Sequence, residues 1–554
     1  MLITRPDRYQ PNGWEDDMTL RRAVRDELYE DKELGCGNFL FKARDVSPTK
    51  ALPFLFLERP FTTPQGKTFT EFSLDTLYET VRSIAQWYAA QGIGKNDIVC
   101  TLFEPGIGHF VHYLALNSLG ATAAIINNKL PSDVVTQYMK QNGFQTLVGE
   151  FEPSDQVNAK GTLPEEWPVK MTADHMVMIC HSSGTTNIPK GIVYTHGQHF
   201  IGKRERLKQF IEDPEDCMVT GMPPAHSAGI SYLMTAVMLE LRTLVLSRLT
   251  GASVAANIMQ FAPSIVTGFA QTWSSLAEQN LPRGAFGSVK RFYNTGDTPH
   301  EKHVAKMLRL APSARFTDGY GSSELAMAQF EKVSTANDVA SRRCVGRPRW
   351  FVDSVIIVDA AGNPLPDGPI GYIAIKSPTL TPGYYNQPLL TQLGRLPGGY
   401  WLTGDVGYKT DEGEFYQVDR SYDVITTPNG PLYSLATEEL LLKIPGIHDA
   451  VVIGANRFPL NIQSTVAIIV PERGQTIDPS VVLDKFREVE QFSRDGLPPF
   501  TLCVAVVEDS SKVPVGCTGK VLKRALRDSF WGTYRAYTSG DRNTFLDVAW
   551  NALP

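Results

Sequence analysis

Strand signals and helix signals alternate along most of this chain, and this alternation restricts the possible folds more than any other feature. Residues 73–91 carry apolar side chains at helical spacing, and residues 97–102 form a short, mostly apolar stretch typical of a buried strand. The order repeats in residues 110–119, a predicted helix, and residues 121–126, a predicted strand. Repeated strand-and-helix units predict an α/β fold with a mostly parallel sheet covered by helices.

The character of the sequence changes after about residue 383, and a second unit begins near Arg420. Residues 404–430 are rich in Gly, Asp, Thr and Pro, and short strand and helix signals follow them. We therefore predict a large N-terminal domain over residues 1–419, with several subdomains and parallel-rich sheets. A small α+β C-terminal domain is predicted over residues 420–554, which is an ordinary domain size.

Charge and hydropathy exclude several classes of function. The 554 residues carry a formal net charge of −6, which gives no basic surface for a nucleic acid. An acid interrupts the basic run Lys-Arg-Glu-Arg at residues 203–206, and we interpret this run as a solvated helix face. The longest apolar stretch, residues 230–246, contains Glu240 and Arg242 and is short for a membrane span, so a buried helix followed by a strand is expected.

The cysteines and the chain ends indicate a reducing compartment. The seven cysteines are scattered and form no Cys-x-x-Cys pair, so neither a disulfide framework nor a zinc knuckle is expected. The N-terminus lacks the apolar core of a signal peptide, and the last three residues match no targeting address. We expect a cytoplasmic protein.

The most specific motif is a run of small and hydroxylated residues that ends in Pro-Lys-Gly. It reads Ser182, Ser183, Gly184, Thr185, Thr186, Asn187, Ile188, Pro189, Lys190, Gly191. Such a loop presents hydroxyls and backbone N–H groups to an anion, and a lysine adds positive charge for outer phosphates. Residues 176–180 before it are a predicted strand, and open α/β sheets bind ligands at strand ends. An ordinary polar loop is the alternative.

This run resembles the phosphate-loop signature of the adenylate-forming superfamily, which comprises acyl- and aryl-CoA synthetases, nonribosomal adenylation domains and luciferases. Further signatures follow in the same order, and the resemblance extends from about residue 97 to residue 527. Residues 318–324 resemble the second signature. The resemblance implies that Tyr320 stacks on adenine, that Ser323 contacts phosphate and that Glu324 helps to hold Mg²⁺, for which a carboxylate is a suitable ligand.

Two more signatures concern the adenosine. Residues 294–299 resemble the adenine-side strand and turn, with Asp297 in place of a usual glycine. Residues 400–405 resemble the ribose signature, in which the carboxylate of Asp405 accepts hydrogen bonds from both ribose hydroxyls. Arg420 matches the arginine that contacts ribose and phosphate, and Tyr422 stands where a hinge Asp or Lys is usual.

Residues 514–523 resemble the final signature, and Lys520 is its implied catalytic cation. Attack of a carboxylate on a phosphate brings negative groups together, so a point charge and Mg²⁺ must offset the repulsion. The resemblance also implies that the C-terminal domain is mobile: it inserts Lys520 for adenylation and then withdraws it. The alternative is an exposed lysine on a Gly-rich turn.

The resemblance thus implies one site. Its catalytic members are Lys520, His226 and Glu324. Its nucleotide-binding members are Ser182, Ser183, Gly184, Thr185, Thr186, Lys190, Thr295, Gly296, Asp318, Gly319, Tyr320, Gly321, Ser323, Asp405 and Arg420. Its Mg²⁺ ligands are Glu324 and Thr185.

Residues 223–229 align with a segment that bounds the acyl pocket. His226 lies where amino-acid-activating relatives keep an aspartate for the substrate ammonium, and burying an ammonium without a carboxylate is costly. An α-amino acid is therefore not the expected substrate. Small and aromatic candidate lining residues favour an aromatic or medium-length acyl group; these are Gly268, Phe269, Ala270, Gln271, Gly319, Ala326 and Met327.

We expect ATP and Mg²⁺ as cofactors, a small-molecule carboxylic acid as substrate, and neither a nucleic acid nor a membrane as partner. CoA is the favoured acceptor. A separate carrier protein or an amine is the alternative, because residues 426–433 lack the cations usual in CoA ligases. The departures at Asn187, Asp297 and Tyr422 motivate a third hypothesis, a nucleotide-binding protein with degraded catalysis.

Overall fold

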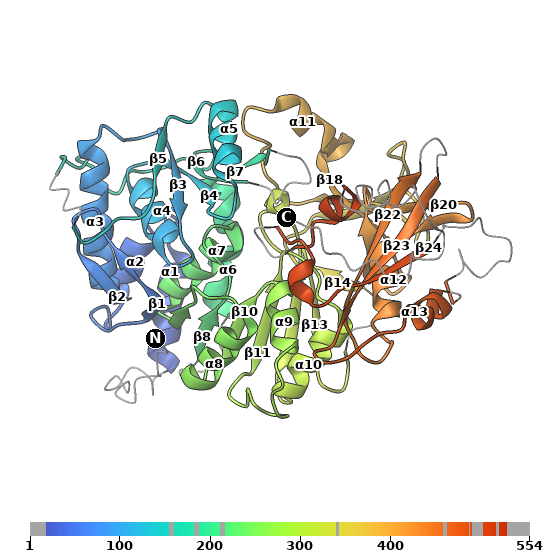
Figure 1. Cartoon of the computed structure of the whole chain (residues 1–554). Coiled ribbons are helices and arrows are strands. Elements are labelled where there is room, and N and C mark those ends of the chain that lie inside the picture. The colour runs from blue at the N-terminus through green and yellow to red at the C-terminus, as the bar shows by residue number, and fades with distance from the viewer. Residues whose placement is uncertain are drawn as a thin grey trace.

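The computed structural model describes residues 18–154, 160–181, 188–210, 216–339, 343–457, 462–486, 488–489, 502–516 and 520–528. Over these residues the chain forms a five-stranded, a fourteen-stranded and a three-stranded sheet and a two-stranded ribbon. Figure 1 shows the five-stranded sheet at the upper left, the large sheet extending from β2 and β1 below it through the middle of the molecule, and the three-stranded sheet at the right. The predicted α/β fold is confirmed.

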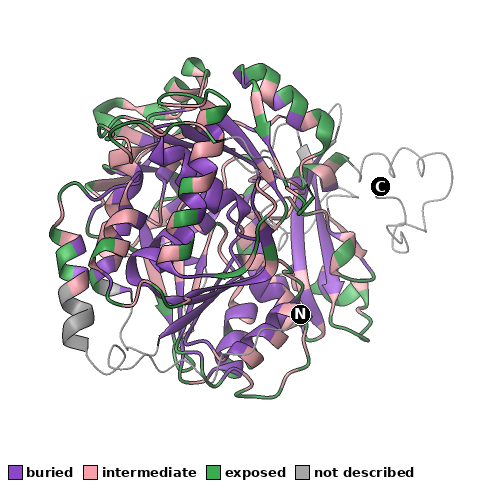
Figure 2. Ribbon diagram, turned by 90° about the vertical axis from the view of Figure 1, so that its left-hand side faces the viewer, coloured by how far each residue is buried: buried purple, intermediate pink, exposed green. Residues whose placement is uncertain are grey.

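The five-stranded sheet has the order β5-β3-β4-β6-β7 and is parallel except for β7. Its strands are β3 (Ile98–Phe103), β4 (Thr122–Asn127), β5 (Thr146–Val148), β6 (Met176–His181) and β7 (Gly191–Thr195). Helix α3 (Leu74–Ala90) precedes β3, and α4 (Gly108–Ser118) and α5 (Ser132–Asn142) connect β3, β4 and β5. The helix and strand predictions over residues 73–126 are confirmed. Every residue of α4 is buried, and Figure 2 shows the sheet and its inner helices as one buried core.

The centre of the fourteen-stranded sheet is parallel, in the order β12-β11-β10-β8-β9-β1, and antiparallel β2 forms the edge. These strands are β1 (Leu55–Thr62), β2 (Thr68–Phe72), β8 (Cys217–Thr220), β9 (Arg242–Val245), β10 (Ile265–Gly268), β11 (Arg291–Thr295) and β12 (Arg315–Tyr320). The helices of this region are α1 (Met18–Glu30), α2 (Phe39–Val46), α6 (His196–Gln209), α7 (Ser227–Leu239), α8 (Gly251–Phe261), α9 (Ala270–Ala277) and α10 (Glu301–Leu310).

Residues 230–246 form most of α7 and then β9, both buried, so the expected helix followed by a strand is confirmed. Within the described ranges, every helix is too short or too polar to traverse a lipid bilayer.

The large sheet continues beyond β12 as an antiparallel part, in the order β13-β14-β19-β18-β16-β15. Its strands are β13 (Phe330–Ser334), β14 (Cys344–Pro348), β15 (Ser354–Val358), β16 (Gly371–Lys376), β18 (Tyr400–Lys409) and β19 (Phe415–Arg420), with short β17 (Arg395–Leu396) beside β18. Helix α11 (Pro388–Leu393) precedes β17.

A separate small sheet follows the last strand of the large one. The ribbon β20 (Ile425–Thr427) and β21 (Gly430–Leu432) turns at the Asn-Gly pair, and α12 (Ser434–Leu441) follows. The sheet has the order β22-β23-β24, with α13 (Pro479–Phe486) before β24; the strands are β22 (Ile447–Arg457), β23 (Ile462–Pro471) and β24 (Leu502–Val506). Side chains such as Leu441, Val452 and Phe486 form a hydrophobic core of its own. A boundary at residues 419 and 420 stays a prediction, and it coincides with the end of β19.

Candidate active site

One cavity lies at the carboxyl ends of the parallel strands in the large sheet. The segments that follow β8, β10, β11 and β12 each contribute to its wall. Parallel strands that point the same way end at the same edge of a sheet, and loops at that edge are the usual ligand site of an open α/β sheet. The strand end predicted from the sequence was a different one, after residues 176–180, and the loop that follows it lies outside the described residues.

Most described members of the predicted site line this cavity: Lys190, His226, Thr295, Gly296, Gly319, Gly321, Ser323, Glu324, Asp405, Arg420 and Lys520. The predicted acyl-pocket residues Phe269, Ala270, Gln271, Gly319, Ala326 and Met327 line it too, whereas Gly268 does not. The residues of the phosphate-loop run from Ser182 to Asn187, which include the predicted Mg²⁺ ligand Thr185, lie outside the described residues.

Two predicted members, Asp318 and Tyr320, do not line the cavity. Successive side chains of a strand point to opposite faces, so Thr317 and Gly319 of β12 face the cavity and these two face away. Asp318 faces a small second cavity and accepts a hydrogen bond from Asn294, and burial raises its pKa to about 7. Tyr320 is buried, and its hydroxyl donates to Asp405 at 2.6 Å.

The pair Asp405 and Arg420 forms the wall opposite these loops. The two residues are direct partners across β18 and β19, which fixes their spacing through the strand register. Burial raises the pKa of Asp405, while the guanidinium of Arg420 and the hydroxyl of Tyr320 favour its ionised form. The guanidinium of Arg420 also donates to the hydroxyl of Tyr422 at 2.8 Å.

Lys520 enters the cavity from the C-terminal part of the chain. Its Nζ lies 3.8 Å from Asp297 Oδ1, and Arg420 Nη2 lies 3.9 Å from the same oxygen. A backbone hydrogen bond from Gly516 N to the Lys520 carbonyl, at 2.7 Å, closes the turn that carries the lysine. The Lys520 side chain is only 17% exposed. One carboxylate thus faces two cations from different segments.

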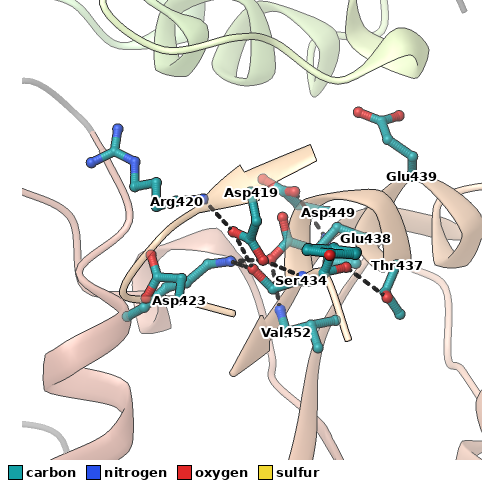
Figure 3. A network of polar contacts seen from close by, with 12 residues as sticks. Asp419, Arg420, Asp423, Ser434, Thr437, Glu438, Glu439, Asp449 and Val452 are labelled. Carbon is teal, nitrogen blue, oxygen red and sulfur yellow. Dashed lines mark hydrogen bonds and ion pairs between the residues drawn. The ribbon is translucent and has the colours of Figure 1, made fainter. Parts of the chain in front are cut away.

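A buried polar network holds the segment after Lys520 in place, and Figure 3 shows the surroundings of this network. Lys523 Nζ lies 2.7 Å from Glu438 and 2.6 Å from Ser434 Oγ. Ser434 donates in turn to Asp419, which belongs to β19 (Figure 3). Arg527 pairs with Asp423 just beyond that strand. These contacts tie the turn of Lys520 to α12 and to the end of β19.

His226 caps the N-terminus of α7, where its Nδ1 accepts a hydrogen bond from Ala228 N at 3.2 Å. Its ring meets the ring of Phe269 edge-on, with centroids 5.2 Å apart. Burial, with a smaller effect of His181, lowers the pKa of His226 to about 4. The imidazole is therefore neutral at physiological pH, and because Nδ1 accepts, Nε2 carries the proton that can be donated.

Glu324 lies in a short 3₁₀ turn (Ser323–Leu325) directly after β12. Its Oε1 accepts a hydrogen bond from the Tyr384 hydroxyl at 2.9 Å. Lys190 Nζ lies 5.1 Å from the centre of the same tyrosine ring. A carboxylate retains further acceptor positions after one such bond, so Glu324 has the donor chemistry that Mg²⁺ requires.

The interpretation of residues 203–206 as a solvated helix face was wrong. Lys203 is 1% exposed and lies 3.1 Å from His199, one helical turn away, and burial lowers its pKa to about 7. Arg204 donates to backbone carbonyls near the N-terminus, including that of Leu34. Arg206 lines the cavity. Helical spacing places His199, Lys203 and Arg206 on one face, and that signal was available in the sequence.

Sequence reasoning also missed several aromatic and charged residues that line the cavity. They are Phe210, Tyr232, Tyr293, Glu331, Arg349 and Tyr384. They come from α7, β11, β13, the residue after α6 and two loops, so only the folded arrangement brings them together.

Comparison with known proteins agrees with this geometry. The family model described as AMP-binding enzyme matches residues 58–385. A 3-aminoavenalumate diazotase from a Streptomyces species is 30% identical over 93% of this chain and 99% of its own. A 2-succinylbenzoate–CoA ligase of Geobacillus kaustophilus is 24% identical over 86% of this chain and 97% of its own.

Solved structures share the fold. A benzoate–CoA ligase from Burkholderia xenovorans superposes with a TM-score of 0.74 at 16% identity, covering 89% of this chain and 100% of that one. An anthranilate–CoA ligase in complex with anthranoyl-AMP superposes with a TM-score of 0.77 at 15% identity, covering 91% of this chain and 98% of that one. Together with the family match over residues 58–385, these findings establish that the chain belongs to the AMP-binding enzymes of the adenylate-forming superfamily.

Proposed function

We propose that this enzyme uses ATP to convert a carboxylic acid into an acyl adenylate and then transfers the acyl group to the thiol of CoA. The observation that carries the proposal is the position of Lys520 in one cavity with Glu324, Asp405 and Arg420. In the first step a carboxylate oxygen attacks the α-phosphorus, the bond from that phosphorus to the bridging oxygen breaks, and pyrophosphate leaves. The ammonium of Lys520 offsets the negative charge that gathers there.

The other residues have roles that follow from their chemistry. Asp405 accepts hydrogen bonds from the ribose hydroxyls, and Arg420 holds it ionised while contacting phosphate. His226 donates from Nε2 to the substrate carboxylate and stays neutral, so it does not trap the acid as a tight ion pair. Glu324, with Thr185, would hold Mg²⁺, which supplies charge neutralisation at the phosphates.

Fewer observations bear on the acceptor of the acyl group than on the formation of the adenylate. Two CoA-ligase relatives, of 2-succinylbenzoate and of benzoate, support CoA as the thiol. The β20–β21 turn lacks the cations usual in CoA ligases, and this favours the alternative of a carrier-protein thiol or an amine. A panel of aryl and medium-length acids, assayed for pyrophosphate release with and without CoA, separates these outcomes. An acyl-CoA product supports the proposal, and adenylate without a thioester supports the alternative.

A second candidate function is ATP-dependent diazotisation, favoured by the 30% identity to a 3-aminoavenalumate diazotase along nearly the full length of both chains. Forming a diazonium group from an aryl amine requires a nitrosyl donor. Nitrite is an oxyanion, and a site that activates a carboxylate at an α-phosphorus has the chemistry to activate nitrite in the same way. The amine nitrogen would then attack the nitrosyl nitrogen, AMP would leave, and loss of water would give the diazonium ion.

The same assay tests this candidate when nitrite and an aryl amine replace the acid and CoA. Pyrophosphate release that requires nitrite, with a diazonium product, would favour it over the acid ligase. Folded protein that binds ATP but releases no pyrophosphate with any acid or with nitrite would contradict both and favour degraded catalysis. The variant Lys520→Ala serves as the control for release at this site.

A further inference from the structure

One end of the active-site cavity contains an arginine, Arg206, that forms no ion pair with any described residue. Arg206 projects from α6, and its Nη1 donates to the carbonyl and hydroxyl oxygens of Ser231, both at 3.2 Å, and to Thr235 Oγ1 at 2.9 Å. No carboxylate among the described residues forms an ion pair with Arg206, and its Nε and Nη2 donate to no described group. Two donor groups thus remain for a ligand in the cavity.

The walls beside this guanidinium are aromatic. Its central carbon lies 4.5 Å from the centre of the Tyr232 ring and 5.8 Å from that of Phe210. Phe210 stacks on Tyr293 with centroids 5.3 Å apart and planes 21° apart. Aromatic faces of this kind bury a flat apolar ring favourably, while the cation selects a negative group attached to it.

The other charges near this end are those of one ion pair and one further carboxylate. Arg349 Nη1 lies 2.8 Å from Glu331 Oε2, so this pair is neutral overall. The carboxylate of Glu205 accepts a hydrogen bond from the Tyr29 hydroxyl at 3.0 Å and forms no ion pair with Arg206. Burial lowers the pKa of Arg206 and the charge of Arg349 acts in the same direction, while Tyr232, Tyr293 and the carboxylate of Glu331 act against them. An arginine remains protonated under such conditions, and a partly desolvated, unpaired cation favours an anionic partner.

Helix α7 gives the distance from this arginine to the reacting end of the cavity. His226 caps the helix, and Ser231 and Thr235, which hold the guanidinium, are five and nine residues further along. At 1.5 Å per residue, the guanidinium lies about 8–14 Å from His226 along the helix axis. An aromatic acid with a substituent at its far end spans such a distance.

We propose that Arg206 forms a subsite for a second carboxylate, so that the enzyme acts on aromatic acids that carry one carboxylate for activation and another at the opposite end. This inference rests on the proposed acid activation and specifies its substrate class. One carboxylate lies beside His226 and is activated. The ring lies between Phe210, Tyr232 and Tyr293, and the distal carboxylate pairs with the free donors of Arg206.

The test compares a matched pair of acids, trans-cinnamate and 4-carboxycinnamate, in full-length enzyme. Pyrophosphate release gives kcat and KM for each acid, and titration calorimetry gives their affinities independently of turnover. The variants are Arg206→Gln, Arg206→Lys as the conservative change, and Lys208→Gln as the control. Lys208 lies on the same helix but points away, at 42% side-chain exposure and 3.9 Å from Glu30, so its substitution removes an equal charge outside the cavity.

We expect the wild type to favour 4-carboxycinnamate over cinnamate by about 10- to 100-fold in kcat/KM and in affinity, which is the range of a charge-assisted hydrogen bond. Arg206→Gln should abolish this preference, so the readout is the ratio of the values for the two acids rather than the value for either acid. Arg206→Lys should restore part of it, and Lys208→Gln should leave it intact.

A wild type without preference for the diacid, or a preference that persists in Arg206→Gln, would overturn the subsite. If neither acid releases pyrophosphate, the proposed acid activation fails, and the calorimetric preference still decides whether Arg206 binds the distal carboxylate. Circular dichroism and ATP affinity, measured for each variant, separate loss of the subsite from loss of the fold.

Discussion

His300 links the two parts of the chain through a contact that depends on its charge. The residue caps α10 of the large part, and its Nδ1 lies 2.8 Å from Glu439 and its Nε2 3.5 Å from Asp449, both in the small part. Figure 3 labels both acids, and Glu439 points away from the network around Asp419. Burial opposes protonation, but the carboxylates of Glu439 and Asp449 outweigh it and raise the pKa of His300 to about 9.

Other groups at this contact do not provide the same charge. His303 lies beside His300, and burial lowers its pKa to about 4, so it is neutral. Arg343 Nη1 lies 3.9 Å from Glu439 Oε1 and is a second cationic group beside it. A second histidine, His448 of the small part, has its Nε2 3.3 Å from Oε1 of Glu278 in the large part. The proton on His300 is therefore the main titrating charge that joins Glu439.

The size of the effect follows from the pKa difference. If the small domain rotates away after adenylation, as the family resemblance implies, His300 returns to its ordinary pKa of about 6.5. Its protonation stabilises the docked arrangement fully below pH 6.5, and this stabilisation is lost as the pH rises through 9. Between pH 7 and pH 9 the docked state should lose about 2 kcal/mol, or roughly 40-fold in the docking equilibrium.

Fluorescence energy transfer between the two parts measures this equilibrium. Labels on Leu389→Cys in α11 and Val481→Cys in α13 use exposed positions. The docked fraction should fall between pH 7 and pH 9 in the parent protein, and His300→Gln should remove most of this slope. His175→Gln, which changes a histidine of the N-terminal part, is the matched control. A docked fraction that does not vary with pH, or an equal slope in His300→Gln, would refute the coupling.

Three further predictions concern single side chains. Lys523→Met leaves Glu438 buried without its partner, so it should destabilise the protein by about 3–5 kcal/mol in urea unfolding; adding Glu438→Gln should recover much of this loss. Lys520→Ala should lower the rate of pyrophosphate release several hundredfold or more and leave the unfolding transition unchanged; a near-normal rate would contradict the assigned role. Burial opposes ionisation of Glu58, but hydrogen bonds from the backbone and guanidinium of Arg248 lower its pKa to about 2. Glu58→Gln should therefore cost about 3 kcal/mol at neutral pH, and progressively less as the pH falls from 4.5 towards 2; a cost that does not vary with pH in unfolding titrations would contradict this.

The sequence predicts those features of the sheet and of the site that depend on short-range residue patterns. Strand and helix periods are local, so residues 73–126 were assigned correctly. The convergence of the loops after β8, β10, β11 and β12 was not predicted, because it depends on the order of these strands in the sheet. The resemblance assigned Asp318, Gly319 and Tyr320 alike to nucleotide binding, but the two-residue period of the strand places Gly319 toward the cavity and the other two away from it.

The sequence around Arg206 does not determine whether its face of the helix is buried. Its run of charges resembles a solvated surface, and solvent is the usual environment of such a run. Whether that face of α6 meets water depends on where α7 packs, and α7 begins more than twenty residues later. The helical period predicts that His199, Lys203 and Arg206 share a face, but only the fold shows that the face is buried. The sequence motifs therefore could not predict the subsite that we propose for Arg206.

Asp297 bears on whether departures from the family signatures indicate lost catalysis. A glycine at this turn would remove the carboxylate that lies near both Lys520 and Arg420, and Arg420 would keep only its second acidic neighbour, Asp405. The carboxylate of Asp297 lies 3.8 Å from one and 3.9 Å from the other, so it can hold both before the nucleotide binds. The phosphates that enter would then replace one anion by another, and neither cation would have to move far. A substitution that keeps both catalytic cations in position is better explained as part of a working site than as its decay.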